Sequence, residues 1–367
     1  MGWWIVVMVA VALATLAGVY YLSLDIYSIR LLDKLREKNK LLAHLAAYCV
    51  VLALFIVCWI LFSLINAAVI VLHMVVFRFI TTLVAHFARR MHKNVPRRAF
   101  LGSLSATFVV IYLAFGAYSA FHITRTEYKL TTEKTTSSLR AVLIADTHIG
   151  ATFDGEGFAE HIEVIMKEKP DVVFICGDFV DDNTELEDMT DACAALAPLT
   201  EQCRVLYVFG NHDEGYYDKT SRGYSGEDLE NELIKNGVIV LQDEIYDLGG
   251  GFSVIGRKDR SDKKRLDIAD LISEAEDDKY IIVLNHQPND YKNEAAAGAD
   301  LVLSGHTHGG QLIPITRVGE WIGENDNTYG YEHIEDTDFI VTSGLADWEI
   351  IFKTGCVSEY VVIDINR

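Results

Sequence analysis

The chain has 367 residues, half of them hydrophobic, and carries a formal net charge of −20. The first 124 residues contain 11 Lys or Arg and 3 Asp or Glu, and the rest of the chain contains 21 and 49, so the two parts have net charges of +8 and −28. This division excludes a simple soluble monomer and a disordered chain, and it disfavours long nucleic acid as a partner because phosphates would meet an acidic surface.

Long apolar segments in the first part are typical of membrane-spanning helices. Residues 1–24 contain no charged side chain, and residues 41–88 contain only Arg78. Because a spanning helix needs ~20 apolar residues, the second segment predicts two helices that turn near residues 63–66. A further uncharged segment follows at residues 99–123. We therefore expect a transmembrane region at residues 1–124, with helices at about 2–24, 41–63, 65–88 and 99–123.

Two basic loops predict the orientation of these helices. Five Lys or Arg lie at residues 30–40, between the first and second helices, and five more lie at residues 89–98, between the third and fourth. The positive-inside rule puts both loops in the cytoplasm. We therefore predict a multi-pass protein of the cell membrane, with the lipid bilayer as a partner and with everything after Thr124 on the extracytoplasmic side.

Arg78 lies inside the third predicted helix, where a charged side chain is costly and a functional role is one explanation. It precedes the inner end of that helix by about 15 Å, which is far for its side chain to reach the interface unaided. We interpret Arg78 as one member of a buried structural pair and keep a functional role as the alternative.

In the second part of the chain, apolar strand-like segments repeatedly end in polar motifs. Residues 125–138 are interpreted as a linker that contains the first strand. Helical segments lie between the early strands, which predicts an α/β fold. Because ligands bind beyond the carboxyl ends of strands in such folds, we expect the polar motifs to meet in one site. The motifs are Asp146-Thr147-His148, Gly177-Asp178, Gly210-Asn211-His212-Asp213, Asn285-His286 and Gly305-His306-Thr307-His308.

The side chains of these motifs are oxygen and imidazole donors without a thiolate, which suits Mn, Fe or Zn better than a soft-metal cluster. The candidate metal ligands are Asp146, His148, Asp178, Asn211, His286, His306 and His308. Seven donors are too many for one tetrahedral ion, and two ions that share Asp178 would activate a water molecule and hold a phosphoryl group. We predict two divalent metal ions, with Mn favoured and Fe or Zn as alternatives.

The ordered motifs D-x-H, G-D-x-x-D, G-N-H-D, a single His and G-H-x-H resemble those of the calcineurin-like metallophosphoesterases, over residues 139–365. Residues 305–311, Gly330-Tyr331 and Ser343-Gly344-Leu345 are similar to a membrane-anchored bacterial branch related to the transmembrane protein with metallophosphoesterase domain. The resemblance implies that residues 139–367 form an αββα sandwich. The complete predicted architecture is therefore a four-helix transmembrane region followed by this α/β domain.

The resemblance also implies a division of the metal ligands. One ion would be held by Asp146, His148, Asp178 and His308, and the other by Asp178, Asn211, His286 and His306. A metal-bridging hydroxide would attack phosphorus in line.

The two residues that follow Asn211 are the candidate catalytic residues. His212 would lie beside the leaving oxygen, with Asp213 orienting it. Asp181 is expected to orient metal ligands. Protein phosphatases of this superfamily have an Arg at the position of Asp182, so the sequence does not favour that activity.

The predicted function is hydrolysis of a phosphoester or pyrophosphate bond in a small or lipid-linked substrate close to a membrane. A long polyanion would be repelled by the acidic domain, whereas a small ester or a lipid headgroup could reach the metals. Two alternatives stay open: a phosphodiesterase acting on soluble nucleotides outside the cytoplasm, and a non-catalytic membrane receptor. Four aromatic residues are interpreted as packing residues, with contact to substrate or lipid headgroups as the alternative; they are Tyr216, Tyr217, Trp321 and Trp348.

Overall fold

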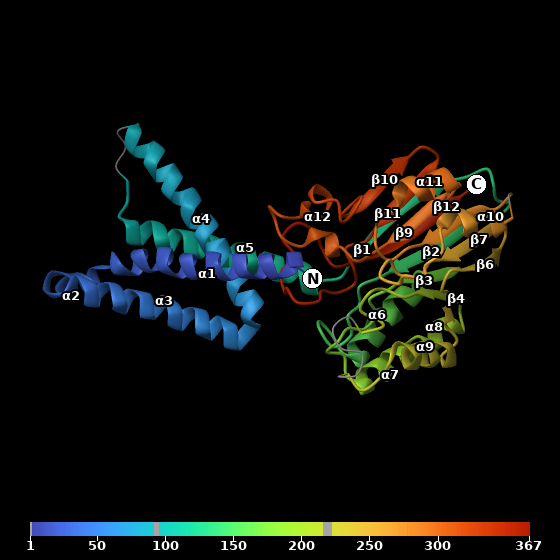
Figure 1. Ribbon diagram of the computed structural model, residues 1–367, viewed down its shortest axis with the longest axis horizontal. Coiled ribbons are helices and arrows are strands. Elements are labelled where there is room, and N and C mark those ends of the chain that lie inside the picture. The colour runs from blue at the N-terminus through green and yellow to red at the C-terminus, as the bar shows by residue number, and fades with distance from the viewer. Residues whose placement is uncertain (1, 92–94, 216–221, 277) are drawn as a thin grey trace. The chain divides into compact units, whose positions relative to one another are not determined.

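The computed structural model describes residues 2–91, 95–215, 222–276 and 278–367 (Figure 1). The chain forms two compact units, residues 1–116 and 117–367, and each is described by itself. Tyr216 and Tyr217 lie outside the described residues.

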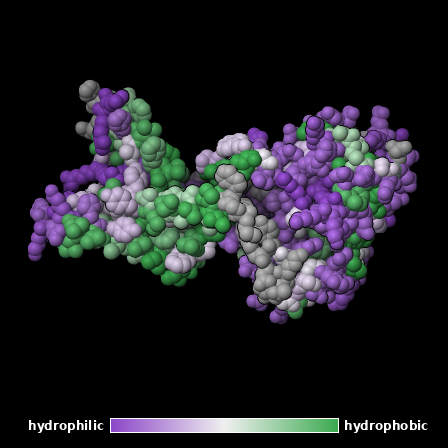
Figure 2. Space-filling model, viewed as in Figure 1, coloured by the Kyte–Doolittle hydropathy of each residue, from purple (hydrophilic) through white to green (hydrophobic). Residues whose placement is uncertain are grey.

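The first unit contains long apolar helices joined by short connections. Among the described residues, four helices are long and apolar enough to cross a membrane, and the surface of this unit is largely hydrophobic (Figure 2). They are α1 (Gly2–Tyr27), α3 (Lys40–Phe62), α4 (Leu64–Arg90) and α5 (Arg98–Phe121), with η1 (Arg30–Leu32) and α2 (Asp33–Lys38) between the first two. The predicted turn near residues 63–66 is confirmed, since Ser63 separates α3 from α4 and its hydroxyl accepts a bond from the Asn66 N–H.

Arg78 of α4 lies buried against Asp25 of α1. Its Nε and Nη2 atoms donate to the two carboxylate oxygens of Asp25 at 2.8 and 3.0 Å, and only 2% of the Arg78 side chain is exposed. Arg98 adds a third contact, from its Nε atom to Asp25 Oδ1 at 2.8 Å. The interpretation of Arg78 as a member of a buried structural pair is confirmed.

The second unit is built on two six-stranded sheets. The order in the first sheet is β1-β12-β2-β3-β4-β5 and in the second β10-β11-β9-β8-β7-β6. The first sheet consists of β1 (Thr124–Thr131), β2 (Leu139–Ile144), β3 (Val172–Cys176), β4 (Arg204–Val208), β5 (Ile239–Val240) and β12 (Glu359–Asn366). The second consists of β6 (Glu244–Gly249), β7 (Phe252–Gly256), β8 (Tyr280–Leu284), β9 (Leu301–Ser304), β10 (Gly330–Ile334) and β11 (Thr337–Val341).

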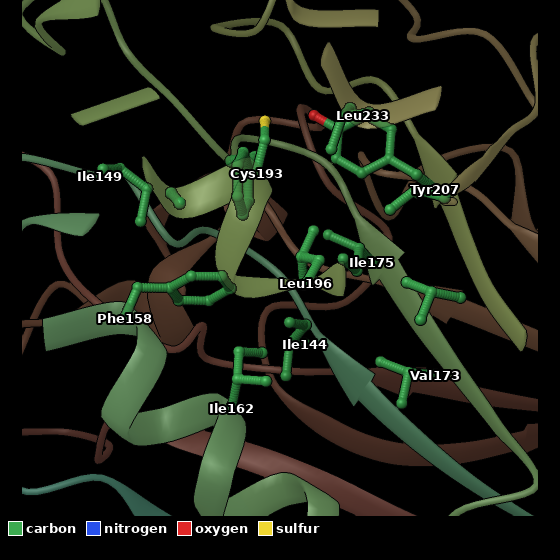
Figure 3. Packing of buried hydrophobic residues seen from close by; sticks show 14 of the residues in the cluster. Ile144, Ile149, Phe158, Ile162, Val173, Ile175, Cys193, Leu196, Tyr207 and Leu233 are labelled. Carbon is green, nitrogen blue, oxygen red and sulfur yellow. The ribbon is translucent and has the colours of Figure 1, made fainter. Parts of the chain in front are cut away.

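Helices cover the outer face of each sheet. Figure 3 shows the layer between the first sheet and its helices, where Ile144 and Val173 pack with Phe158 and Ile162. The helices of this layer are α6 (Gly155–Met166), α7 (Leu186–Ala195), α8 (Ala197–Thr200) and α9 (Gly226–Lys235). On the second sheet, α10 (Ile268–Glu274) and α11 (Tyr291–Ala297) cover the opposite outer face.

The two sheets pack on each other through a second apolar layer. Residues alternate along β2, so that Val142 and Ile144 point to the helices while Ala141 and Leu143 point to the second sheet. Phe252 and Leu303 are among the residues that meet them there. The four layers are helices, sheet, sheet and helices, and the predicted αββα sandwich is confirmed.

The end of α5 and the start of β1 are tied to the segment that precedes β12. The N–H and hydroxyl of Ser358 bond to the carbonyls of Ser119 and Ala120 at 2.9 and 2.7 Å, and its carbonyl accepts the N–H of Thr124. β1 then runs parallel to β12, which lies antiparallel to β2. All of these residues belong to the second unit.

Candidate metal centre

The five polar motifs follow β2, β3, β4, β8 and β9, and the structure brings their side chains together. The first three of these strands are parallel neighbours in one sheet, and the last two are parallel neighbours in the other. Bonds between the sheets join the motifs: His306 N donates to both oxygens of Asp146 at 2.9 and 2.8 Å, and His286 Nδ1 lies 2.7 Å from the Cys176 carbonyl. The site therefore lies where the carboxyl ends of both sheets meet.

Six of the seven candidate ligands form two groups of three. Asp146, His148 and His308 offer ligand atoms that lie within 4.8 Å of one another, and Asp178, His286 and His306 do the same. Both groups could hold a metal ion.

Asp178 belongs to the second group and also faces the first. Its Oδ1 atom accepts the N–H of His212 at 2.8 Å, and its Oδ2 atom lies 3.1 Å from His286 Nε2 and 3.9 Å from His148 Nε2. One carboxylate thus faces imidazoles of both groups. This is the arrangement that a carboxylate shared by two ions requires.

The donor atoms fit divalent ions on the structure's own evidence. The Oδ1 atom of Asn211 is buried and has no hydrogen-bond partner among the described residues, although buried amide oxygens nearly always have one. The Nε2 atoms of His148 and His308 face each other at 3.3 Å, and both rings are buried or nearly so. A cation in the group of His148 and His308 would accept the lone pairs of these two nitrogens, and a cation in the other group would satisfy Asn211.

Hydrogen bonds to the second ring nitrogen select the nitrogen that each histidine offers. The Cys176 carbonyl accepts a hydrogen bond from His286 Nδ1–H, and the Ala346 carbonyl lies 3.3 Å from His308 Nδ1. With the proton on Nδ1, the Nε2 lone pair points to the centre of the site. These tautomers follow from the bonding partners.

Burial and mutual charge set the protonation of the ligands. Burial lowers the pKa of His306 to about 3 and holds that of His148 well below its usual value, so both rings are neutral. Burial alone would raise the pKa of Asp178, but His286 and the other imidazoles hold it well below the usual range. Asp178 in turn outweighs the burial of His286 and raises its pKa to about 10. Metal binding must therefore release a proton from His286.

The backbone at the ligands is unusual. Five of the seven have a positive φ: Asp146 (50°), His148 (40°), Asp178 (50°), His306 (72°) and His308 (48°). Such conformations are uncommon outside glycine and cost on the order of 1–3 kcal/mol each, and they persist where the surroundings determine them. Here they turn side chains from the three loops that follow β2, β3 and β9 toward one point.

Gly210 shows why the G-N-H-D motif begins with glycine. A Cβ atom at this position would lie 2.2 Å from Asp178 Oδ1 and 2.4 Å from Asp178 N. Any side chain would displace Asp178, which faces both groups of ligands.

The two candidate catalytic residues have different surroundings. His212 is 8% exposed, and its Nδ1 atom lies 3.6 Å from Asp182 Oδ2. The ring centroid of Trp348 lies 5.2 Å from that of His212. The acid beside the His212 ring is thus Asp182, at the position where protein phosphatases have an Arg.

The Asp213 carboxylate, expected beside the His212 ring, bonds to the backbone instead. It accepts N–H bonds of 2.7–3.2 Å, from Asp178, Phe179, Val180 and Gly210. Asp213 therefore holds the two loops that carry Asp178 and Asn211.

Arg222 and Asp181 also contact the loops that carry the polar motifs. Arg222 donates to the carbonyls of His212 and Asp213. Asp181, expected to orient ligands, lies 3.9 Å from His148 Nδ1 through its Oδ2 atom.

The buried ion pair of Asp347 and Lys353 lies beside His308. Asp347 Oδ1 lies 3.6 Å from His308 Nδ1 and 3.2 Å from Lys353 Nζ, and Lys353 is fully buried. Lys353 also donates to the Ser343 carbonyl at 2.8 Å. The sequence did not indicate this pair, because a lysine in an irregular segment is typical of an exposed loop; the nearby Ser343-Gly344-Leu345 motif was the only signal.

A cavity of about 360 Å³ lies beside the metal centre. It begins at Gly210 of the G-N-H-D motif and continues to the loop that follows β7. Its charged lining residues are Glu214, Lys258, Asp259, Asp262, Lys263 and Lys264. Three lysines and three acids thus balance in charge in this lining, whereas the domain as a whole is strongly acidic.

Comparisons with known proteins agree with this geometry. The family model described as calcineurin-like phosphoesterase matches residues 139–310. An uncharacterized metallophosphoesterase of Aquifex aeolicus is 32% identical over 217 residues, which cover 56% of this chain and 78% of the relative.

Two further relatives are matched over a smaller share of their length. An uncharacterized metallophosphoesterase of Helicobacter pylori is 29% identical over 232 residues, 62% of this chain and 60% of the relative. The transmembrane protein with metallophosphoesterase domain of Danio rerio is 29% identical over 189 residues, 49% of this chain and 42% of the relative. The chain thus spans about 60% or less of these two proteins.

Proposed function

This chain belongs to the calcineurin-like phosphoesterase family, and from that premise we propose that it is a membrane-anchored, metal-dependent phosphoesterase with two ions in its site. The observation that carries the proposal is the position of Asp178, a member of one group of three candidate ligands whose carboxylate also faces His148 of the other group. The apolar helices α1, α3, α4 and α5 would anchor the enzyme in the cell membrane, with the catalytic domain on the extracytoplasmic side.

The ligand groups suggest how two ions would be held. Asp146, His148, Asp178 and His308 would hold one, and Asp178, Asn211, His286 and His306 the other. Their carboxylate, imidazole and amide atoms suit Mn, with Fe or Zn as alternatives. When bound, the ions would supply an activated water molecule and neutralise charge on the phosphoryl oxygens.

His212 is the proposed general acid. Its imidazole would donate a proton to the leaving oxygen, and the nearby Asp182 carboxylate would stabilise the protonated ring before that transfer. The Trp348 ring packs against one side of the His212 ring. Asp213 and Arg222 act as positioning residues, since they bond to the backbone of the loop that carries His212.

The cavity beside Gly210 is lined by three lysines and three acids, and Lys258 Nζ lies 3.8 Å from Asp262 Oδ2. Lys263 and Lys264 are the candidates to bind a phosphate that is not transferred, while the net charge of −28 repels long polyanions. A phosphoester or pyrophosphate in a small or lipid-linked molecule satisfies both conditions. We place the lipid-linked substrate first because the chain carries its own apolar helices.

The first experiment measures metal content and hydrolysis of bis(p-nitrophenyl) phosphate by the full-length protein in detergent, with Mn supplied. We expect about two metals per chain in the wild type. Asp178→Asn should lose metal and activity together, whereas His212→Ala should keep the metal and lose activity. A wild type that neither binds metal nor turns over the ester would favour the receptor instead.

The role of Asp182 is tested with two leaving groups. A poor leaving group needs the proton of His212 more than p-nitrophenol does, so Asp182→Asn should lower the rate more for an alkyl ester, by roughly tenfold. Equal losses for both esters would remove Asp182 from the mechanism.

The substrate class is tested by comparing a lipid pyrophosphate in mixed micelles with a cyclic nucleotide. Preference for the lipid supports the proposal, and preference for the nucleotide would favour a phosphodiesterase on soluble substrates. Substitution of Lys263 and Lys264 by Ala should raise KM for the preferred substrate and leave bis(p-nitrophenyl) phosphate unaffected.

A further inference from the structure

A strip of exposed apolar side chains follows the metal ligand His308 in the chain. Its largest members are Ile315 (54% exposed), Trp321 (71%) and Ile322 (67%), and Ile313 (50%) begins it. Figure 2 shows hydrophobic atoms at the place of α12 (Val318–Trp321), on a surface that is otherwise mostly hydrophilic. We refer to residues 313–322 as the apolar strip.

The apolar strip is held in place by its own bonds. The Ile313 N–H donates to Thr354 Oγ1 at 3.0 Å, and the carbonyl of Gln311 accepts the N–H groups of Thr354 and Gly355. Gln311 Nε2 also donates to Asp347, the acid beside His308. The strip is therefore attached to the metal centre at one end.

The same bonds lead to the end of the last apolar helix. Thr354, the partner of Ile313, lies four residues before Ser358, which bonds to the carbonyls of Ser119 and Ala120 in the last turn of α5. Four residues of extended chain span at most ~14 Å. Ile313 is therefore less than ~20 Å from the point where α5 ends.

The charges on the strip are balanced. Arg317, its one basic residue, is bonded to Glu320 of the same segment at 2.7 Å. The apolar side chains, and not a basic patch, thus dominate the surface. Exposed Trp and Ile beside a spanning helix are typical of segments that lie in the membrane interface, where an indole ring is accommodated well.

We propose that the apolar strip docks into the headgroup layer of the bilayer that α5 crosses, and thereby presents the metal centre to phosphates of lipid headgroups. This inference rests on the proposed function for the anchoring of the chain and for the reaction. The bilayer is the occupant that the observations favour, because the strip is tied within ~20 Å of the end of a spanning helix. From this docking we infer that the substrate is a lipid phosphoester or a lipid pyrophosphate.

The contact itself is tested by photocrosslinking in nanodiscs of phosphatidylcholine. A benzophenone amino acid replaces Ile322 in the full-length protein, and Ile234 of α9, an exposed isoleucine (54%), provides the matched control. We expect crosslinks to lipid from position 322 at least fivefold above those from position 234. Because Arg317 is paired, adding anionic lipid should change the ratio by less than twofold. Equal crosslinking at both positions would overturn the proposal.

The consequence for substrate is tested with Ile315→Ser, Trp321→Ser and Ile322→Ser combined in one variant. None of these residues belongs to the metal centre. Hydrolysis of a lipid pyrophosphate in the nanodisc should fall at least tenfold in kcat/KM, while hydrolysis of soluble bis(p-nitrophenyl) phosphate stays within twofold. Ile234→Ser should alter neither rate.

The outcomes separate this inference from the proposed function. A wild type inactive on both substrates would refute the phosphoesterase, and the crosslinking would still decide whether the strip meets lipid. An active wild type whose triple variant keeps full lipid turnover, or loses both activities equally, would overturn the role of the strip.

Discussion

The carboxylate of Asp213 accepts the backbone N–H of Asp178 at 2.9 Å, so a residue of one motif holds the backbone of the central ligand of another. Asp213→Asn would turn an amide N–H₂ toward N–H donors and leave them unsatisfied. We expect a loss of about 3 kcal/mol in the free energy of unfolding, together with loss of metal. Denaturant unfolding and metal analysis measure both.

Asp182→Asn is the matched control, because Asp182 faces the ring of His212. It should change the free energy of unfolding by less than about 1 kcal/mol. If Asp213→Asn instead kept its stability and metal and lost only rate, Asp213 would act on the His212 ring, as the sequence predicts.

Lys353→Met would leave Asp347 as a buried charge without its cation. Removal of one partner from a buried ion pair costs about 3–5 kcal/mol, and the pKa of Asp347, which Lys353 holds below its usual value despite burial, should rise. Lys235→Met removes a pair of similar length, 2.8 Å to Glu232, with a 70% exposed ammonium group. That exposed pair should cost less than about 1 kcal/mol. Similar losses in thermal melts would show that Lys353 is not an essential partner of Asp347.

Arg78 and Asp25 should be coupled in a double-mutant cycle. Asp25→Asn alone leaves the buried charge of Arg78 without its carboxylate and should cost about 3 kcal/mol, whereas Arg78→Gln should cost less because Arg98 still contacts Asp25. The double variant should cost clearly less than the sum of the two. Unfolding of the full-length protein in mixed detergent micelles measures these energies. Arg36→Gln, which breaks a more exposed pair with Asp33, serves as the control. Additive losses would contradict the coupling.

Glu294 should make stability depend on pH. It is fully buried, both described bonds go to its Oε1 atom, and burial raises its pKa to about 7 although Arg257 lowers it. Between the unfolded pKa near 4.5 and about 7, the folded protein keeps a proton that the unfolded chain has lost. Stability therefore falls as pH rises through this window, by about 3 kcal/mol.

Glu294→Gln stays neutral and should remove this slope. The difference in melting temperature between wild type and Glu294→Gln, measured from pH 4 to pH 8, isolates Glu294 from groups common to both. A difference that is constant with pH would mean that folding does not raise the pKa of Glu294.

The local pattern of the sequence was sufficient to predict the helices, the fold class and the six ligands that the structure brings into two groups. Each depends on short-range information: an apolar length for a spanning helix, and a polar motif after a strand for a ligand such as Asp146 or His308. Parallel strands place their carboxyl ends at the same edge of a sheet. The meeting of the motifs could therefore be predicted without knowing how the loops fold.

The supporting residues could not be predicted because their roles depend on tertiary contacts. Lys353 and Arg222 lie in irregular segments, and only the folded chain shows that each is buried and bonded to residues of the site. In the sequence, Asp182 indicates only that the phosphate-binding Arg of protein phosphatases is missing. In the structure, its carboxylate lies beside His212. The sequence predicts that Asp213 orients His212, whereas its carboxylate accepts backbone N–H groups, which carry no sequence signal.

The position of β12 between β1 and β2 has a consequence for biogenesis. Strand β2 carries the first ligands into the sheet, yet its neighbour consists of residues 359–366, which the ribosome makes after every metal ligand. Until those residues emerge, the edge of β2 has unpaired N–H and carbonyl groups and β1 has no strand to join. The apolar helices are complete early in translation, whereas we expect the candidate metal site to become able to hold ions only after the strand at residues 359–366 has been added.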